Sequence, residues 1–109
     1  GADVVTRGDI WLVNLDPTVG SEIQKARPCV VVSPPEIHNF LRTALVAPMT
    51  SKGFGAPFRV PVTHGGKRGL VLLDQVRAVD KVRLVKKAGR VSEKTLAAVL
   101  AGFQEMFAE

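Results

Sequence analysis

Short apolar runs broken by proline and glycine occupy most of this chain, and this pattern most constrains its fold. The runs are rich in β-branched residues and too short for typical helices, so they favour strands. Proline donates no hydrogen bond to a sheet and glycine adopts turn conformations, so each break predicts the end of a strand. We expect strands at residues 9–16, 28–33, 43–49, 57–62, 69–73 and 76–79.

The connections between these runs carry further signals. The polar stretch 18–26 is longer than most loops in compact domains, which makes it the first candidate for a functional loop. Two prolines lie within 57–62, which indicates an edge strand. The glycines of His64-Gly-Gly-Lys67 predict a hairpin turn. We expect one helical turn at 35–40, and a helical turn followed by a short strand at 80–90.

Only the end of the chain has helical periodicity. Ser92 is a good N-cap and Glu93 suits the positive start of a helix. Apolar residues then recur at helical spacing: Leu96, Val99, Leu100, Phe103, Met106 and Phe107. The sequence therefore predicts a single domain over residues 1–109, mainly β with one α element. Its architecture is a small barrel or strongly curved antiparallel sheet with a C-terminal amphipathic helix.

Charge and cysteine content narrow the class of protein. The formal net charge is +5, and all of this surplus lies in the second half of the chain, which favours polyanionic partners. The one cysteine, Cys29, excludes an internal disulfide and a cysteine-based zinc site, and it suits a reducing compartment. No apolar run approaches 18 residues. We expect a cytoplasmic protein without a membrane partner.

Few residues are typical of catalysis. The chain has two histidines, His38 and His64, which we expect to be surface residues, and Cys29 lies in a strand where an inert core thiol is expected. The sequence contains no phosphate-binding loop, dinucleotide fingerprint or metal-ligand cluster, so we expect no cofactor and no metal. Polar residues instead gather where predicted strands begin or end: Ser21, Glu22, Lys25, Arg27, Thr50, Ser51, Lys52, Asp74 and Gln75.

These same segments carry a family resemblance. The runs Gly8-Asp-Ile-Trp-Leu-Val-Asn-Leu-Asp-Pro-Thr-Val-Gly-Ser-Glu22 and Arg27-Pro-Cys-Val-Val-Val-Ser33 closely resemble the MazF/PemK family of toxin endoribonucleases. The resemblance continues through Val46-Ala-Pro-Met-Thr-Ser51 and Leu72-Leu-Asp-Gln-Val-Arg-Ala-Val-Asp80. It covers nearly the whole chain, in family order and with family-like spacing.

The resemblance implies a fold and an activity. Family members adopt a PemK-like, SH3-like barrel and form homodimers that cleave single-stranded RNA at short sequences without a metal ion. Attack by the 2′-hydroxyl leaves a 2′,3′-cyclic phosphate and a 5′-hydroxyl. A cognate MazE-like antitoxin holds such toxins inactive, and its flexible tail, expected to be acidic, would suit a basic toxin.

The resemblance also assigns site residues. By position, Arg27 and Thr50 look like the catalytic pair, and Glu22 on the active-site loop is a candidate base or a group that positions Arg27. Residues expected to help bind RNA are Ser21, Lys25, Pro28, Ser51, Lys52, Phe54, Asp74 and Gln75. Lys25 departs from the family pattern, since most members have glycine at that position.

Two other functions remain open at this level. A CcdB-like toxin has the same fold but binds and poisons DNA gyrase without cleaving RNA. Such toxins use a Trp-Gly-Ile motif, whereas the one tryptophan here, Trp11, lies in the first predicted strand. The second alternative is an RNA-binding module without catalytic activity. The residues at the positions of Arg27 and Thr50 favour the endoribonuclease.

Overall fold

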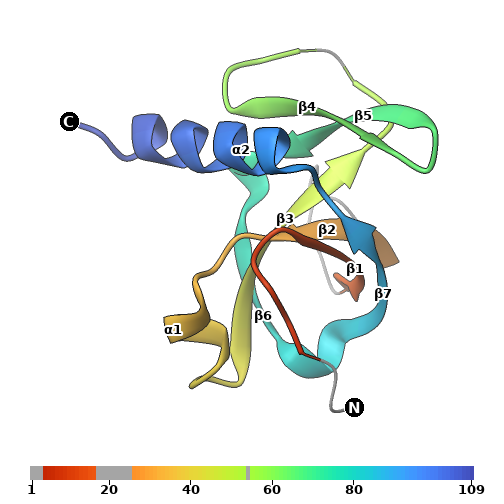
Figure 1. The fold of residues 1–109 in the computed structure, drawn as a ribbon, viewed down its shortest axis with the longest axis vertical. Coiled ribbons are helices and arrows are strands. Elements are labelled where there is room, and N and C mark those ends of the chain that lie inside the picture. The colour runs from red at the N-terminus through yellow and green to blue at the C-terminus, as the bar shows by residue number, and fades with distance from the viewer. Residues whose placement is uncertain (1–3, 17–25, 54) are drawn as a thin grey trace.

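The computed structural model shows a strongly bent antiparallel sheet with a helix packed along one end (Figure 1). The structure describes residues 4–16, 26–53 and 55–109. Its strands are β1 (Asp9–Asn14), β2 (Ala26–Val31), β3 (Thr43–Thr50), β4 (Arg59–His64), β5 (Lys67–Leu72), β6 (Arg77–Asp80) and β7 (Leu84–Arg90). Its helices are α1 (Pro35–His38), α2 (Glu93–Met106) and the 3-10 turns η1 (Leu73–Gln75) and η2 (Lys81–Arg83).

Strand β3 organises the sheet. The strand order is β4-β5-β3-β2-β1-β7, with β6 pairing with β3 outside this path. The first half of β3 pairs with β6, from Thr43 opposite Asp80 to Val46 opposite Arg77. Its last two residues instead pair with β5, Met49 with Val71 and Thr50 with Leu70. This change of partner turns the β4–β5 hairpin away from the rest of the sheet and gives a half-barrel.

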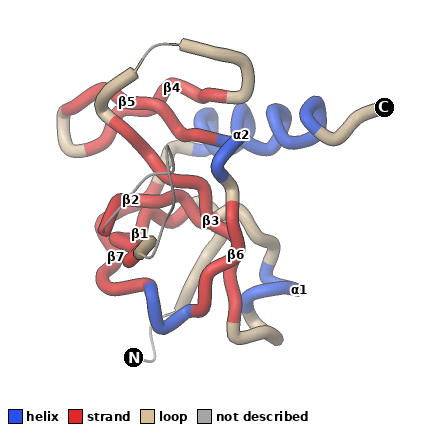
Figure 2. Tube along the Cα trace, turned by 180° about the vertical axis from the view of Figure 1, so that it is seen from behind, coloured by secondary structure: helices blue, strands red, loops and turns tan. Residues whose placement is uncertain are grey.

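The central strands β1 and β3 are buried on both faces, which explains why their sequences are so continuously apolar. On one side, Ile10, Val30 and Ala47 belong to a core cluster against which Leu96 and Phe103 of α2 pack. On the other side, Trp11, Val13 and Cys29 are among the residues of a second buried cluster inside the half-barrel. Seen from behind, α2 runs beside the β4–β5 hairpin, at the opposite end from α1 (Figure 2).

Most of the predicted elements are present, and the fold class is confirmed. The hairpin turn consists of Gly65 and Gly66, whose φ values of 60° and 76° lie in the left-handed region that glycine adopts freely. Strand β4 is an edge strand, as its prolines predict. Ser92 caps α2, because its Oγ accepts a hydrogen bond from the backbone N of Thr95 at 3.1 Å.

Three details differ from expectation. Strand β2 begins at Ala26, inside the predicted loop, because Ala26 and Arg27 continue the ladder with β1. Strand β7 has 7 residues rather than being short, since it pairs along most of β1. Phe107 follows the last turn of α2 and is exposed, so it does not join the core.

The two histidines are not ordinary surface residues. His38 is only 1% exposed, and its Nδ1 lies 2.9 Å from the hydroxyl of Ser33, so the surface prediction is wrong for this residue. His64 is half-buried at the end of β4. Cys29 is fully buried, and burial raises the pKa of its thiol to about 12, as the prediction of an inert core thiol requires. No helix in the described ranges is long and apolar enough to cross a membrane.

Candidate active site

Arg27 lies on β2 at the margin of the half-barrel. It pairs with Val13 of β1, two residues along from Cys29 in the same strand. Side chains two residues apart project from the same face of a strand, and Cys29 is buried whereas Arg27 is exposed. The guanidinium therefore stands just beyond the edge of the core, where a charged group keeps its solvation while its strand is fixed by pairing.

Thr50 is the last residue of β3. Its Oγ1 accepts a hydrogen bond from the backbone N of Lys52 at 3.1 Å. A threonine hydroxyl has two lone pairs and one proton, so this bond leaves the O–H able to donate to a ligand. The short turn after β3 thus fixes the orientation of the Thr50 side chain.

Arg27 and Thr50 line one cavity of about 200 Å³. Strands β2, β3, β4 and β5 all contribute to its walls. The described residues that line it are Arg27, Pro28, Met49, Thr50, Ser51, Val62, His64, Lys67, Arg68 and Gly69. The structure therefore brings together four of the residues singled out from the sequence, Arg27, Pro28, Thr50 and Ser51.

The β4–β5 hairpin supplies site residues that the sequence did not indicate. His64, Lys67 and Arg68 line the cavity, and His64 pairs directly with Lys67 across the turn. A Cβ on Gly69 would lie 2.5 Å from the carbonyl oxygen of Thr50, so glycine is what allows the hairpin to approach β3 this closely. The Gly65-Gly66 turn signalled the hairpin, but nothing local signalled that it folds over Thr50.

The cavity is strongly basic. Arg27, Lys67 and Arg68 are cationic, and the described lining residues include no carboxylate. Opposite charges attract strongly where solvent is partly excluded, so the arrangement favours an anionic ligand. Arginine in particular binds the paired oxygens of a phosphate through two parallel N–H donors. The described part of the site therefore suits a phosphodiester.

Other predicted site residues lie outside this cavity. Lys52 is exposed and contributes its backbone N–H rather than its ammonium to the Thr50 contact. Asp74, in η1, accepts two hydrogen bonds from the guanidinium of Arg59, Nε to Oδ1 at 3.2 Å and a terminal nitrogen to Oδ2 at 3.1 Å. This carboxylate raises the pKa of Arg59. Gln75 is half-buried beside Asp74.

The remaining predicted residues, Ser21, Glu22, Lys25 and Phe54, lie outside the described residues. Their proposed roles therefore remain predictions from the sequence. Within the described ranges, no group of three His, Cys, Asp or Glu side chains is placed to hold a metal ion.

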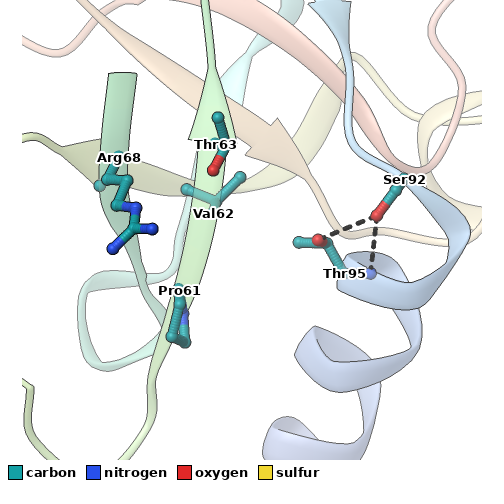
Figure 3. A pocket seen from close by; sticks show the side chains of 7 residues that line it. Pro61, Val62, Thr63, Arg68, Ser92 and Thr95 are labelled. Atoms are coloured by element: carbon teal, nitrogen blue, oxygen red, sulfur yellow. Dashed lines mark hydrogen bonds between the residues drawn. The ribbon is translucent and has the colours of Figure 1, made fainter. Parts of the chain in front are cut away.

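A larger hollow of about 550 Å³ adjoins the cavity (Figure 3). It lies between the β4–β5 hairpin and the first turn of α2, with Pro61, Thr63, Ser92 and Thr95 among its lining residues. Val62, Arg68 and Gly69 line both spaces, so the two share part of their walls. None of the described residues that line the hollow was predicted to be catalytic.

The fold and this basic cavity together define a small β-rich protein with a site for an anionic ligand, and comparison with known proteins identifies its family. Residues 6–107 match the family described as PemK-like, MazF-like toxin of type II toxin-antitoxin system. The chain is 43% identical over 100 residues to Endoribonuclease PemK of Escherichia coli, an alignment that covers 86% of this chain and 75% of that protein.

Solved structures agree with this assignment. The crystal structure of MazF (Form-I) from Deinococcus radiodurans has a TM-score of 0.83 at 27% identity, covering 95% of this chain and 96% of that one. A MazE-MazF structure (Form-II) from the same organism has a TM-score of 0.79 at 25% identity, covering 97% of each chain. The chain belongs to the PemK-like, MazF-like toxin family of type II toxin-antitoxin systems. None of these similarities supports the CcdB-like alternative.

Proposed function

We propose that this chain is a sequence-specific endoribonuclease toxin that cleaves single-stranded RNA without a metal ion. The observation that carries the proposal is the cavity in which Arg27 and Thr50 lie together with Lys67 and Arg68. A family relative is named an endoribonuclease, which supports the same activity. RNA as the substrate and the single buried Cys29 are both consistent with action in the cytoplasm.

The cavity suits a reaction in which RNA supplies its own nucleophile. The 2′-hydroxyl attacks the adjacent phosphorus and forms a bond to it while the bond from phosphorus to the 5′-oxygen breaks. The enzyme has only to hold the phosphate in line, stabilise its added negative charge and move two protons. The products are a 2′,3′-cyclic phosphate and a 5′-hydroxyl, and no covalent enzyme intermediate or cofactor is needed.

Each cavity residue has a role in this reaction. Arg27 donates paired hydrogen bonds to the non-bridging phosphate oxygens, and the Thr50 hydroxyl, oriented by the Lys52 backbone, donates another. Arginine is a poor base because it stays protonated in proteins. We therefore propose Glu22 of the preceding loop as the base that accepts the 2′-hydroxyl proton; its alternative role is to position Arg27.

Sequence selection is expected to use the surfaces beside the reacting phosphate. Single-stranded RNA is read by stacking on splayed bases and by hydrogen bonds to their edges. The hollow between the hairpin and α2 has room for a neighbouring nucleotide, with Arg68 on the shared wall to bind its phosphate. Ser21, Lys25, Phe54, Asp74 and Gln75 remain proposed RNA-binding residues.

Regulation and assembly are proposed from the family. A solved relative is a MazE-MazF structure, which supports a cognate antitoxin as the partner of this chain. The basic surface suits an antitoxin with an acidic, flexible tail. We also propose that the toxin acts as a homodimer, as expected from the family resemblance.

Cleavage of a long, weakly structured RNA in EDTA tests the proposed activity, with the 5′ ends of the fragments mapped by sequencing. We expect cuts at one short sequence, fragments with 2′,3′-cyclic phosphate ends, and no cleavage by Arg27→Ala protein. A single 2′-deoxy substitution at the mapped site should abolish cleavage and leave binding nearly intact. RNA that shifts in a gel but stays whole would instead identify a binding module without catalytic activity.

A further inference from the structure

His64 lines the proposed cleavage cavity, although no local sequence pattern predicts this position. It is the last residue of β4, half-buried, and it lines the same space as Arg27 and Thr50. The hairpin register pairs it with Lys67, so both residues adjoining the Gly65-Gly66 turn lie at the cavity wall. An imidazole thus stands in the pocket that holds the proposed phosphate ligands.

The position of this imidazole is fixed from the other side by β7. A Cβ built on Gly89 would lie 3.3 Å from Cε1 of His64 and 3.7 Å from its Nδ1. The ring therefore packs over a stretch of backbone that carries no side chain. Gly89 itself lies on the edge strand β7, where it pairs with Ile10 of β1. His64 belongs to the β4–β5 hairpin, and its ring packs against β7, so it is not an isolated surface side chain.

The described charged residues that share the cavity of His64 are Arg27, Lys67 and Arg68, and on the side of β7 its ring lies close to Gly89. The imidazole forms no hydrogen bond with the described part of the chain, in contrast to the buried His38, which is bound to Ser33. Nor is it part of a described metal-ligand cluster. Within the described residues, no hydrogen bond occupies its ring nitrogens.

We propose that His64 is the general acid of the cleavage reaction, an inference that rests on the proposed function. The protonated imidazole donates its proton to the 5′-oxygen as the bond between that oxygen and phosphorus breaks. Glu22 takes the proton of the 2′-hydroxyl, and the new bond from the 2′-oxygen closes the cyclic phosphate. The neutral imidazole then regains a proton from water, and Glu22 releases to water the proton that it took. Histidine is the residue type best suited to this role near neutral pH.

A sulfur-substituted substrate isolates this step. A short RNA with the mapped cleavage sequence is made in two forms, with oxygen or sulfur as the bridging 5′ atom, because a thiolate leaves without protonation. General acid catalysis contributes roughly 100- to 10000-fold. We expect His64→Gln to lose about 100-fold or more on the oxygen substrate and to stay within a few-fold of the wild type on the sulfur substrate.

Lys67→Gln is the matched control, since Lys67 pairs with His64 and lines the same cavity but binds phosphate instead of donating a proton to the leaving group. It should slow both substrates by the same factor. Binding of uncleavable 2′-deoxy RNA should change less than about three-fold, and thermal unfolding checks that the variant is folded.

The outcomes separate the two proposals. A wild-type protein that cleaves neither substrate would overturn the proposed function itself. A wild type that cleaves, combined with a folded His64→Gln variant that cleaves the oxygen substrate equally fast, would overturn only the role of His64. Equal loss on the oxygen and sulfur substrates would also overturn it, because the residue would then act before or apart from proton donation.

Discussion

The carbonyl oxygen of Thr50 lies only 2.5 Å from the position that a Cβ would occupy on Gly69. The carbonyl carbon of Thr50 would be 3.3 Å from the same Cβ, so the obstacle is backbone rather than a flexible side chain. Glycine at this position is what allows β5 to pair with the end of β3, and this pairing closes the cavity over Thr50.

Gly69→Ala should therefore damage both the fold and the site. Overpacking of this kind costs typically about 1 to 3 kcal/mol in the free energy of unfolding. Displacing a reacting group by about 1 Å can lower a rate roughly 100-fold, so we expect RNA cleavage to fall more than stability alone explains. Urea unfolding and cleavage rates on the mapped RNA measure the two effects.

Gly55→Ala provides the control for that substitution. A Cβ on Gly55 meets nothing within 4 Å, and its φ does not lie in the left-handed region. The change should leave the free energy of unfolding within about 0.5 kcal/mol of the wild type. If Gly69→Ala behaved like Gly55→Ala, the close approach of β5 to Thr50 would not matter for the site.

The hydroxyl of Thr50 can be tested without changing the size of the side chain. Thr50→Val removes the proposed hydrogen bond to the phosphate, and loss of one such donor costs on the order of 100-fold in rate. Thr50→Ser keeps the hydroxyl and its bond from the Lys52 backbone N, so it should stay within a few-fold of the wild type. Rates are measured at saturating RNA, and a Thr50→Val enzyme of normal rate would remove Thr50 from the mechanism.

Lys86 and Lys87, which are neighbours on β7, allow a matched test of whether the basic surface binds RNA. Lys87 lies 3.5 Å from Oδ1 of the buried Asp9, whereas Lys86 is exposed without an ion pair to the described residues. Lys86→Gln should weaken RNA binding and reduce the slope of log K against log salt by about 0.7, the value for one phosphate contact on a single strand. The free energy of unfolding should stay unchanged.

Lys87→Gln should lower the free energy of unfolding as well, by about 0.5 to 1 kcal/mol, because half of this side chain is exposed to solvent. Asp9 keeps its contact with Arg90 at 3.2 Å, which limits the loss. Filter binding at several salt concentrations and urea unfolding measure the two variants. A Lys86→Gln protein with an unchanged salt slope would show that this part of β7 does not contact the RNA.

The sequence predicts the strands well and the assembled site only in part. Runs such as 43–49 predict strands because proline and glycine end them, and the Gly65-Gly66 pair predicts a hairpin turn. The presence of His64 and Arg27 at one cavity depends instead on β3 changing partner from β6 to β5 near Met49. Such long-range pairing leaves no local pattern, so the hairpin residues of the cavity were missed.

Long-range packing also explains why the surface prediction for His38 is wrong. A lone histidine in a short helical turn looks like a surface residue, yet His38 is buried because α1 folds back onto β3. The backbone N of Leu45 donates to the Ser33 hydroxyl at 3.2 Å, and this hydroxyl in turn is placed to donate to Nδ1 of His38. These hydrogen bonds suit a neutral imidazole, so the free energy of unfolding should depend on pH through His38.

The stability of the fold should fall in mild acid because of His38. Burial, and next the positive charge of Lys81, lower the pKa of His38 from its ordinary value of 6.5. As the pH falls below 6.5, the unfolded chain binds a proton at this residue while the folded chain does not. The free energy of unfolding should therefore decrease by at most about 1.4 kcal/mol per pH unit for this group, until the folded pKa is reached.

Urea unfolding at pH 7.5 and 5.5 measures this dependence, in a window above the ordinary range of carboxylates. His38→Gln should flatten the decrease, whatever its effect on stability at pH 7.5. His64→Gln is the control, since removing the half-buried histidine of the cavity should leave the contribution of His38 in place. If His38→Gln lost stability in acid as steeply as the wild type does, the buried imidazole would not be the titrating group.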